Sequence, residues 1–323
     1  MAEKSKLLSR EIVRTKGKCV ALFVAVLLAL APLLLHGCGG GGFDTPSGVT
    51  DGKQMSSLLS PQQLKSWIDN GYKEERGYKV VVLDTSFGPT ARSDYDSGHI
   101  PGAFYVDFAN ELVKTRSDGP IMVSLMAPDG PQMDALVQKF GIDNNSVVVF
   151  TGHHMYWMTR AYWTFRYWGF PQDRLFVLNG KSSTAKSVWA ASGYILQTAQ
   201  PPLPIPSTFS VSSLTGNIDT VRAPLEEMLK VAQGSLPNTI IEDVRNETEN
   251  TATVGPTFAR AFEYRFKNSV WRPWELNLAG TNVGDPYSVI SPAGSGSHVL
   301  KTPDQLLAEY TALGFATKTA YST

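Results

Sequence analysis

Short apolar runs alternate with amphipathic stretches through the first two thirds of the chain. The apolar runs are rich in β-branched residues, which is typical of strands buried on both faces of a parallel sheet. The amphipathic stretches often start at Ser or Pro and end at Gly, which predicts helices. The predicted strands are 79–85, 146–151 and 174–179, and the predicted helices are 60–71, 128–142 and 158–169. This alternation predicts an α/β domain with a mostly parallel sheet flanked by helices.

A proline-rich segment, residues 198–212, holds four prolines and predicts a stiff, extended linker. The same order of elements starts again beyond it. The predicted elements are a helix over 223–234, a strand over 239–244, a helix over 302–315 and the start of a strand over 316–323. We therefore predict two copies of one domain, residues 57–197 and 213–323, with the second incomplete at its C-terminal side.

The N-terminal 37 residues differ from the rest of the chain in how their charged and apolar side chains are distributed. Residues 1–18 carry six basic and two acidic side chains, and residues 19–37 carry no charged side chain. This pattern is typical of a secretory signal peptide, and an uncleaved membrane anchor is the alternative. The whole chain has 29 basic and 29 acidic residues, so the part after this head has a net charge of −4. Such a balance does not indicate a nucleic-acid partner.

The chain has only two cysteines, Cys19 and Cys38, which excludes a disulfide scaffold or a Cys-based metal site. Leu35-His36-Gly37-Cys38 resembles the bacterial lipobox, whose cysteine is lipidated and becomes the new N-terminus. The resemblance implies a lipoprotein signal peptide at 1–37, lipidation of Cys38 and a Gly-rich tether at 38–56. It also implies a lipid-anchored protein of the cell envelope, and Gly39 after the cysteine implies the outer membrane.

The motif His99-Ile100-Pro101-Gly102-Ala103 follows a predicted strand that ends at Asp84. Together with the LDTS sequence at 83–86, it resembles the rhodanese (thiosulfate sulfurtransferase) family over most of residues 57–197. The tandem form of this family has an inert first domain and a catalytic second one, which implies two rhodanese-like domains here. In the second copy Asp243 and Arg245 match the family's strand end, whereas residues 266–271 lack the HIPGA motif.

The family passes a sulfane sulfur through a cysteine persulfide, and this chemistry needs a thiolate. The cysteine begins a loop whose N–H groups, with the next helix N-terminus, hold an anion. In the first copy this loop is 151–158 and Thr151 stands at the cysteine position, so we predict that this copy is inert. The second copy's equivalent falls just after Thr323, so we expect either a prematurely ended sequence or a truncated, non-catalytic descendant. The candidate anion-binding residues are Thr151, Gly152, His153, His154 and Arg160.

These residues also have interpretations in which they are structural and take no part in catalysis. We expect His99 to bond backbone groups beside the Pro101-Gly102 turn, and Asp84 and Asp243 to fix loops at strand ends. Arg160 is expected to form an ion pair on its helix. The residues His153, His154 and Met155 are a soft-metal set, but neighbouring side chains on a strand point in opposite directions. We therefore expect no metal site, and no cofactor is implied.

The resemblance implies thiosulfate or persulfide sulfur transfer as the family activity, and we expect this chain to lack it for want of a nucleophilic cysteine. The alternative is a non-catalytic binding or scaffold module of an envelope complex that handles sulfur or chalcogen oxyanions or electron transfer. Cys38 is disfavoured as a sulfur carrier, because its Gly-rich surroundings lack an activating loop and helix. The expected partners are the membrane, through the lipid anchor, a small sulfur-containing anion and an envelope protein.

Overall fold

The computed structural model describes residues 57–118, 121–183, 187–214, 221–245, 266, 269–279, 296–315 and 319–322. The predicted signal peptide, the apolar run at 19–37, Cys38 and the whole predicted tether lie outside these residues. Among the helices of the described residues, none is long and apolar enough to cross a bilayer.

The first sheet has five strands in the order β1-β7-β6-β2-β3, and every neighbouring pair is parallel. The strands are β1 (Leu58–Leu59), β2 (Lys79–Asp84), β3 (Phe104–Tyr105), β6 (Ser146–Thr151) and β7 (Leu175–Leu178). The three strands predicted from the sequence are confirmed as the three central ones. The edge strands β1 and β3 have two residues each, too few to leave a pattern in the sequence.

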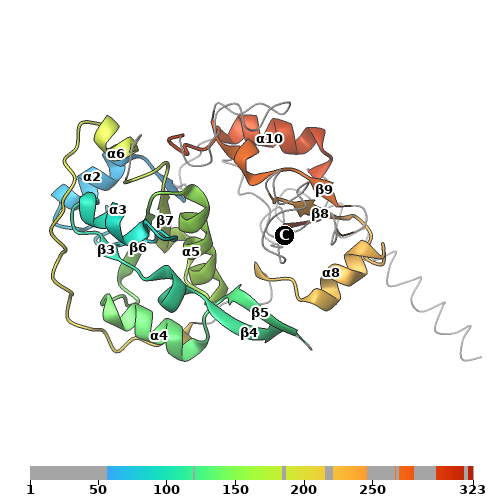
Figure 1. Cartoon of the computed structure of the whole chain (residues 1–323), viewed down its shortest axis with the longest axis horizontal. Coiled ribbons are helices and arrows are strands. Elements are labelled where there is room, and N and C mark those ends of the chain that lie inside the picture. Colours follow the sequence, from blue (N-terminus) through green and yellow to red (C-terminus); the bar gives the residue numbers. More distant parts are fainter. Residues whose placement is uncertain are drawn as a thin grey trace, which may run out of the picture. The chain divides into compact units, whose positions relative to one another are not determined.

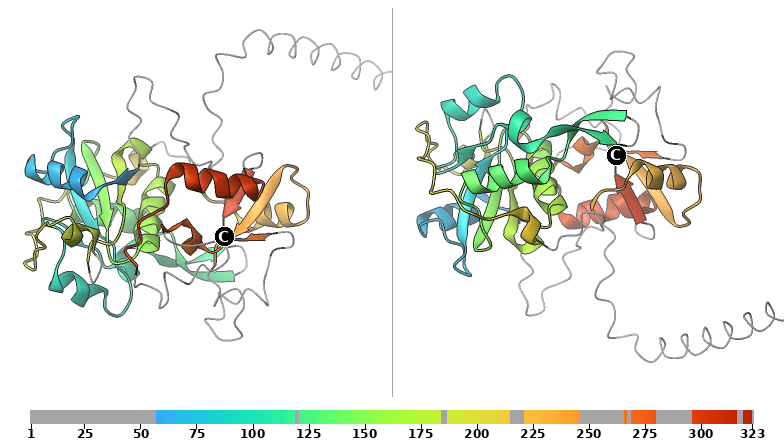
Figure 2. Two further views of the ribbon diagram at one scale, coloured as in Figure 1. Left: turned by 90° about the horizontal axis from the view of Figure 1, so that it is seen from above. Right: turned by 90° about the horizontal axis from the view of Figure 1, so that it is seen from below.

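Helices cover both faces of this sheet (Figures 1 and 2). They are α2 (Pro61–Asp69), α3 (Ala91–Ser97), α4 (Gly130–Lys139), α5 (Met155–Tyr167) and α6 (Val188–Ala191). Successive side chains of a strand point to opposite faces. In β2, Val81 and Leu83 pack in one core with residues of α4 and α5, whereas Val80 and Val82 pack in the other with residues of α2 and α6. Burial on both faces explains the unbroken apolar runs.

Local caps set where the helices begin. The Ser60 hydroxyl accepts the N–H of Gln63 at the start of α2, as its sequence predicts. Helix α5 differs from the prediction of 158–169, because it begins at Met155. Met155 and Met158 are both buried in the core, so the segment 155–158 that we assigned to the loop is the first turn of a helix.

The second sheet has the order β10-β8-β9, again parallel throughout. Its strands are β8 (Thr239–Asp243), β9 (Val270–Trp271) and β10 (Thr319–Ser322), with helices α8 (Leu225–Ala232) and α10 (Pro303–Ala312). Ile241 packs against α8, and Ile240 packs against Tyr310 of α10. The helices and strands predicted after the linker are thus confirmed.

The two sheets repeat one local geometry. Asp84 pairs with Tyr105 between β2 and β3, and Asp243 pairs with Trp271 between β8 and β9. The residue after the short strand donates its N–H to the Asp carbonyl at 2.9 Å in both sheets, from Val106 and from Arg272. All described residues nevertheless belong to one compact unit, so the division into two domains stays a prediction.

The proline-rich segment runs without helix or strand from 198 to 210 and then packs on α4. The N–H of Ser207 donates to Gln138 O at 3.1 Å, and the N–H of Val211 donates to Asp134 Oδ1 at 2.7 Å. Val211 begins the short 3₁₀ helix Val211–Ser213 and is buried in the core of the first sheet. The end of the predicted linker is therefore part of the first packing unit.

Several smaller elements left no signal in the sequence. An antiparallel hairpin joins β4 (Lys114–Asp118) and β5 (Ile121–Met126). A π-helical turn, Phe108–Leu112, follows β3, and 3₁₀ turns occur at Gln172–Arg174 and Trp274–Asn277. The turns are too short to carry periodicity, and β4, with the sequence KTRSD, has no apolar run that would predict a strand.

Candidate functional site

The candidate loop lies at the carboxyl edge of the first sheet. Strand β6 ends at Thr151, between β2 and β7, and α5 begins at Met155. Ligands of open α/β sheets bind outside the carboxyl ends of the strands, beside the N-termini of the helices that follow. The loop predicted from the sequence is therefore on the edge of the sheet where chemistry is expected.

Thr151 is fixed by bonds to the neighbouring strand. Its Oγ1 donates to Leu83 O at 3.2 Å, and its carbonyl oxygen accepts the N–H of Thr85 at 2.8 Å. The Thr151 side chain is fully buried. A threonine hydroxyl also has no ionised form at neutral pH comparable with a cysteine thiolate. In this structure the hydroxyl links two strands and has none of the features of a nucleophile.

Polar groups of the loop are bonded to the loops beside it. The N–H of His153 donates to Ser86 Oγ at 3.0 Å, and that hydroxyl donates to Asp84 Oδ1 at 2.6 Å. The carbonyl of Gly152 accepts the N–H of Ser182 at 2.9 Å. A Cβ at Gly152 would lie 3.2 Å from Ser86 Oγ, so glycine permits this close approach. An anion entering the loop would have to displace these contacts.

The first N–H of α5 is capped by a side chain from the C-terminal part of the chain. Met155 N donates to His298 Nδ1 at 3.3 Å, whereas His154, at the N-cap position, makes no side-chain cap bond. Because Nδ1 accepts, the His298 ring is neutral with its proton on Nε2. N–H groups in the first turn of a helix are the ones that bind anions. The imidazole occupies a place that an anionic ligand would use.

Contacts on both sides of His298 hold the segment that carries it. Ser297 O accepts the N–H of Lys181 at 2.8 Å, and the N–H of Leu300 donates to Asn179 Oδ1 at 2.9 Å. Leu300 also packs against the core of the first sheet. His298 itself has a left-handed backbone, with φ of +58°, and is 2% exposed. The residues after β7 thus position this segment over the loop.

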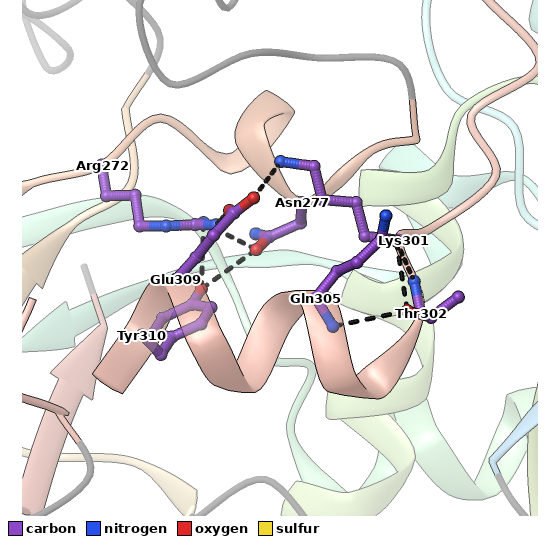
Figure 3. Close-up of polar contacts among 7 residues, drawn as sticks. All are labelled: Arg272, Asn277, Lys301, Thr302, Gln305, Glu309 and Tyr310. Atoms are coloured by element: carbon purple, nitrogen blue, oxygen red, sulfur yellow. Dashed lines mark hydrogen bonds and ion pairs between the residues drawn. The ribbon is translucent and has the colours of Figure 1, made fainter. Parts of the chain in front are cut away.

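A buried polar network anchors the other end of the same segment (Figure 3). Lys301 Nζ and Arg272 donate to the two carboxylate oxygens of Glu309, at 2.6 and 2.7 Å. Arg272 also donates to Asn277 Oδ1 at 2.6 Å and contacts the Tyr310 hydroxyl at 3.3 Å. Glu309 therefore joins the His298 segment to α10 and β9.

Three imidazoles come together at the loop. The ring centroids of His153 and His154 are 4.6 Å apart, and those of His154 and His298 are 5.0 Å apart. Burial is the main cause that lowers the pKa of His154 and of His298 to about 3, and the neighbouring histidines and Lys181 contribute to the same shift. Burial lowers the pKa of His153 too, although Asp94 acts in the opposite direction. Among the described residues no group of three or more His, Cys, Asp or Glu side chains could hold a metal ion.

The motif residues of the first sheet have backbone partners. His99 Nδ1 lies 2.8 Å from Tyr95 O, and its ring stacks on the Tyr95 ring at 3.8 Å. Gly102 has φ of +72°, and a Cβ there would lie 2.3 Å from the Tyr72 hydroxyl. Asp84 accepts the N–H of Ser86 at 3.1 Å, and burial raises the pKa of Asp84 to about 6. These contacts fix the loop after β2 and the turn before β3.

The remaining predicted residues lie in separate places. Asp243 pairs with Arg245 through two bonds of 2.7 and 2.8 Å at the end of β8.

Arg160 makes no ion pair within the described residues, contrary to our expectation for this helix. Its guanidinium donates to Leu125 O at 2.8 Å, and its cationic carbon lies 4.5 Å from the Trp163 ring centroid. Burial lowers the pKa of Arg160 to about 10. The counterpart of Thr151 predicted just after Thr323 lies outside the described residues.

Two residues of the site were not identified from the sequence. Ser86 belongs to the LDTS sequence, so its position after a buried strand was an available signal. His298 lies in a segment with no predicted element, 143 residues from Met155 along the chain. No local pattern could have placed it at the loop.

Comparisons with known proteins agree with this geometry. Residues 60–183 match the family model described as a rhodanese-like domain. The chain is 29% identical over 157 residues to the sulfur carrier protein TtuD of Thermus thermophilus, covering 48% of this chain and 49% of that protein. It is 27% identical over 188 residues to a probable 3-mercaptopyruvate sulfurtransferase of Schizosaccharomyces pombe, covering 56% and 57%. The aligned parts thus span about half the length of these curated relatives.

The fold has solved counterparts as well. The 3-mercaptopyruvate sulfotransferase SseA of Escherichia coli superposes with a TM-score of 0.57 at 14% identity, covering 83% of this chain and 97% of that one. An identity this low supports the fold alone. The architecture is an α/β fold of the rhodanese type. Residues 60–183 match a rhodanese-like domain, and the relatives that the chain resembles are named as sulfur carriers and sulfurtransferases.

Proposed function

We propose that the rhodanese-like domain at 60–183 is a non-catalytic binding module of a sulfurtransferase-type protein. One observation carries the proposal: Thr151, bonded to Leu83 O, stands at the expected cysteine position. The cap that His298 provides for the N–H of Met155 supports it. Both cysteines of the chain, Cys19 and Cys38, precede the domain. Persulfide chemistry needs a thiolate, so the loop cannot carry a sulfane sulfur.

The test is sulfur transfer from thiosulfate or 3-mercaptopyruvate to cyanide. We expect the full chain to form no more thiocyanate than a Cys38→Ser variant, with rat thiosulfate sulfurtransferase as the positive control. Thiocyanate formation above that variant would restore the alternative function, in which the chain itself transfers sulfur as its relatives' names imply.

The variant Thr151→Cys tests the contribution of the capped loop. We expect this change alone to give no measurable turnover, because the introduced thiol would lie in a loop whose N–H groups bond Ser86 and His298. Substantial activity in Thr151→Cys would contradict the proposal that the loop is occupied within the chain. The matched control is Thr159→Cys, at an exposed position on α5.

We further propose that the protein is anchored in the bacterial cell envelope through lipidated Cys38. Support comes from the basic head, the uncharged run and the LHGC sequence. Acyl chains contribute about 0.8 kcal/mol per buried methylene, so several chains hold a protein firmly. We expect Cys38→Ser to abolish palmitate labelling and to release most of the processed protein from membranes, whereas Cys19→Ser leaves both unchanged. Labelling that persists in Cys38→Ser would refute the anchor.

A lipid-anchored binding module of this kind would bind a protein partner in the cell envelope. The N–H groups of His153 and Met155 already bond Ser86 and His298, and this supports a protein or scaffold role over binding of a small sulfur oxyanion at the loop. Affinity capture of the chain with and without Cys38→Ser would identify membrane-side partners, and thiosulfate titration would test the oxyanion alternative.

A further inference from the structure

A cavity of about 350 Å³ opens at the carboxyl ends of β2 and β3; it shares Ser86 with the candidate site, but no residue of the loop 151–158 lines it and the proposed function does not use it. Its lining comes from the loop after β2 and from the start of the π-helical turn. The residues are Ser86, Phe87, Gly88, Pro89, Tyr105, Asp107, Phe108 and Ala109. Binding sites for small molecules start at about 300 Å³, so the cavity suits a ligand of modest size.

Three aromatic residues belong to the lining, and two of them, Phe87 and Tyr105, are only partly buried, whereas Phe108 is 1% exposed. The centroids of Phe87 and Phe108 are 5.4 Å apart, and Trp157 backs both rings at 4.5 and 5.1 Å. Tyr105 adds a third ring to the lining. The faces of such rings attract cations and also accept apolar groups. The packing behind Phe87 and Phe108 keeps these faces in place.

Among the described residues, Asp107 is the one charged residue in the lining of the cavity. Asp107 lines the cavity, and its carboxylate accepts the side-chain N–H of Asn110 at 2.7 Å. Asp84 is paired with Tyr105 across the strands, and its Oδ2 has no hydrogen-bond partner within the described residues. A cation, Arg92, lies over the Tyr105 ring at 5.1 Å and pairs with Asp96. No lysine or arginine belongs to the lining.

We propose that this cavity binds a small organic cation with an apolar body, of the quaternary ammonium or protonated aromatic amine class. The aromatic faces contact the cation and its apolar groups, and Asp107 supplies the opposite charge. Burial and the charges of Asp107 and Asp84 raise the pKa of Tyr105, whereas the charge of Arg92 lowers it. Such a site selects a cation, whereas a thiosulfate site selects an anion.

The test is calorimetric titration of the full chain in a non-ionic detergent. The probes are benzyltrimethylammonium, benzyl alcohol and phenylacetate, which share a ring and differ in charge. We expect saturable binding of the cation, and binding at least about tenfold weaker for the neutral and anionic probes. Equal or tighter binding of phenylacetate overturns the proposal, and so does the absence of saturable cation binding.

Two variants connect the binding to this cavity. Asp107→Asn keeps the oxygen that Asn110 contacts and removes the charge, so we expect about tenfold weaker cation binding with benzyl alcohol unaffected. Phe87→Leu keeps an apolar side chain and removes the ring, so it should also weaken cation binding more than benzyl alcohol binding. The control is Asp69→Asn, an exposed carboxylate paired with Lys65 on α2. Unchanged cation affinity in both variants, with the native circular dichroism spectrum retained, overturns the assignment.

Discussion

Acidification from pH 7 to pH 5 is expected to lower the free energy of unfolding by up to about 2 kcal/mol for each of His154 and His298. Burial lowers the pKa of both rings to about 3, whereas an unfolded imidazole titrates near 6.5. Between those two values the unfolded chain binds protons that the native chain does not, so stability falls as the pH falls. Asp84 acts in the opposite sense. Its pKa is raised to about 6, so the native state takes up a proton at a higher pH than the unfolded state does. This contribution raises the free energy of unfolding as the pH falls below 6.

The variant His298→Asn separates these contributions. Asn keeps a side-chain oxygen that can accept the N–H of Met155, and it tolerates the left-handed backbone at this position. Urea denaturation at pH 7, 6 and 5 should show a weaker loss of stability in the variant, by about 2 kcal/mol at pH 5. The Asp84 contribution is common to both proteins and cancels. Parallel pH profiles for the two proteins would contradict a neutral, buried His298.

Glu309→Ala is expected to destabilise the chain by about 3–5 kcal/mol. The carboxylate is the acceptor for both Arg272 and Lys301, whose side chains are 2% and 7% exposed. Removing it leaves two buried cations without the carboxylate that both contact, and a buried charge that loses its partner is costly. Thermal or urea unfolding of the full chain measures the effect.

The same variant should loosen the His298 cap. Lys301 follows His298 by three residues, so its ion pair with Glu309 helps to hold the imidazole at the N-terminus of α5. Faster hydrogen exchange of the Met155 amide in Glu309→Ala would report this release. Glu226→Ala is the matched control, because it removes a carboxylate from the exposed pair with Lys230 and should change stability little. Stability and exchange equal to those of the control would show that the network does not anchor the segment.

Much of the fold could be predicted because the strongest signals are local. The runs at Lys79–Asp84 and Ser146–Thr151 are apolar throughout because both faces of those strands are buried. Ser60 and Thr302 mark the starts of α2 and α10 as N-cap residues, and such caps depend only on neighbouring residues. The edge strands β1 and β3 were missed because they have two residues each, and the hairpin was missed because β4, with the sequence KTRSD, has no apolar run.

The candidate site was predictable only in part. The end of β6 at Thr151 follows from the strand pattern, and the absence of a cysteine there is a property of the sequence. The start of α5 was placed three residues too late, because Met155 becomes helical through core packing that the sequence pattern did not reveal. Arg160 was expected in an ion pair, but burial against Trp163 and the carbonyl of Leu125 decided its environment.

The sequence by itself therefore determined an α/β fold with parallel strands, a loop at the carboxyl end of β6 and the threonine that stands in it. These features depend on the periodicity and identity of consecutive residues. Only the tertiary structure decided that His298 caps the loop and that Phe87, Tyr105 and Asp107 surround a cavity. These contacts join residues that the chain separates by up to 143 positions, and such pairings arise from packing, which no local pattern encodes.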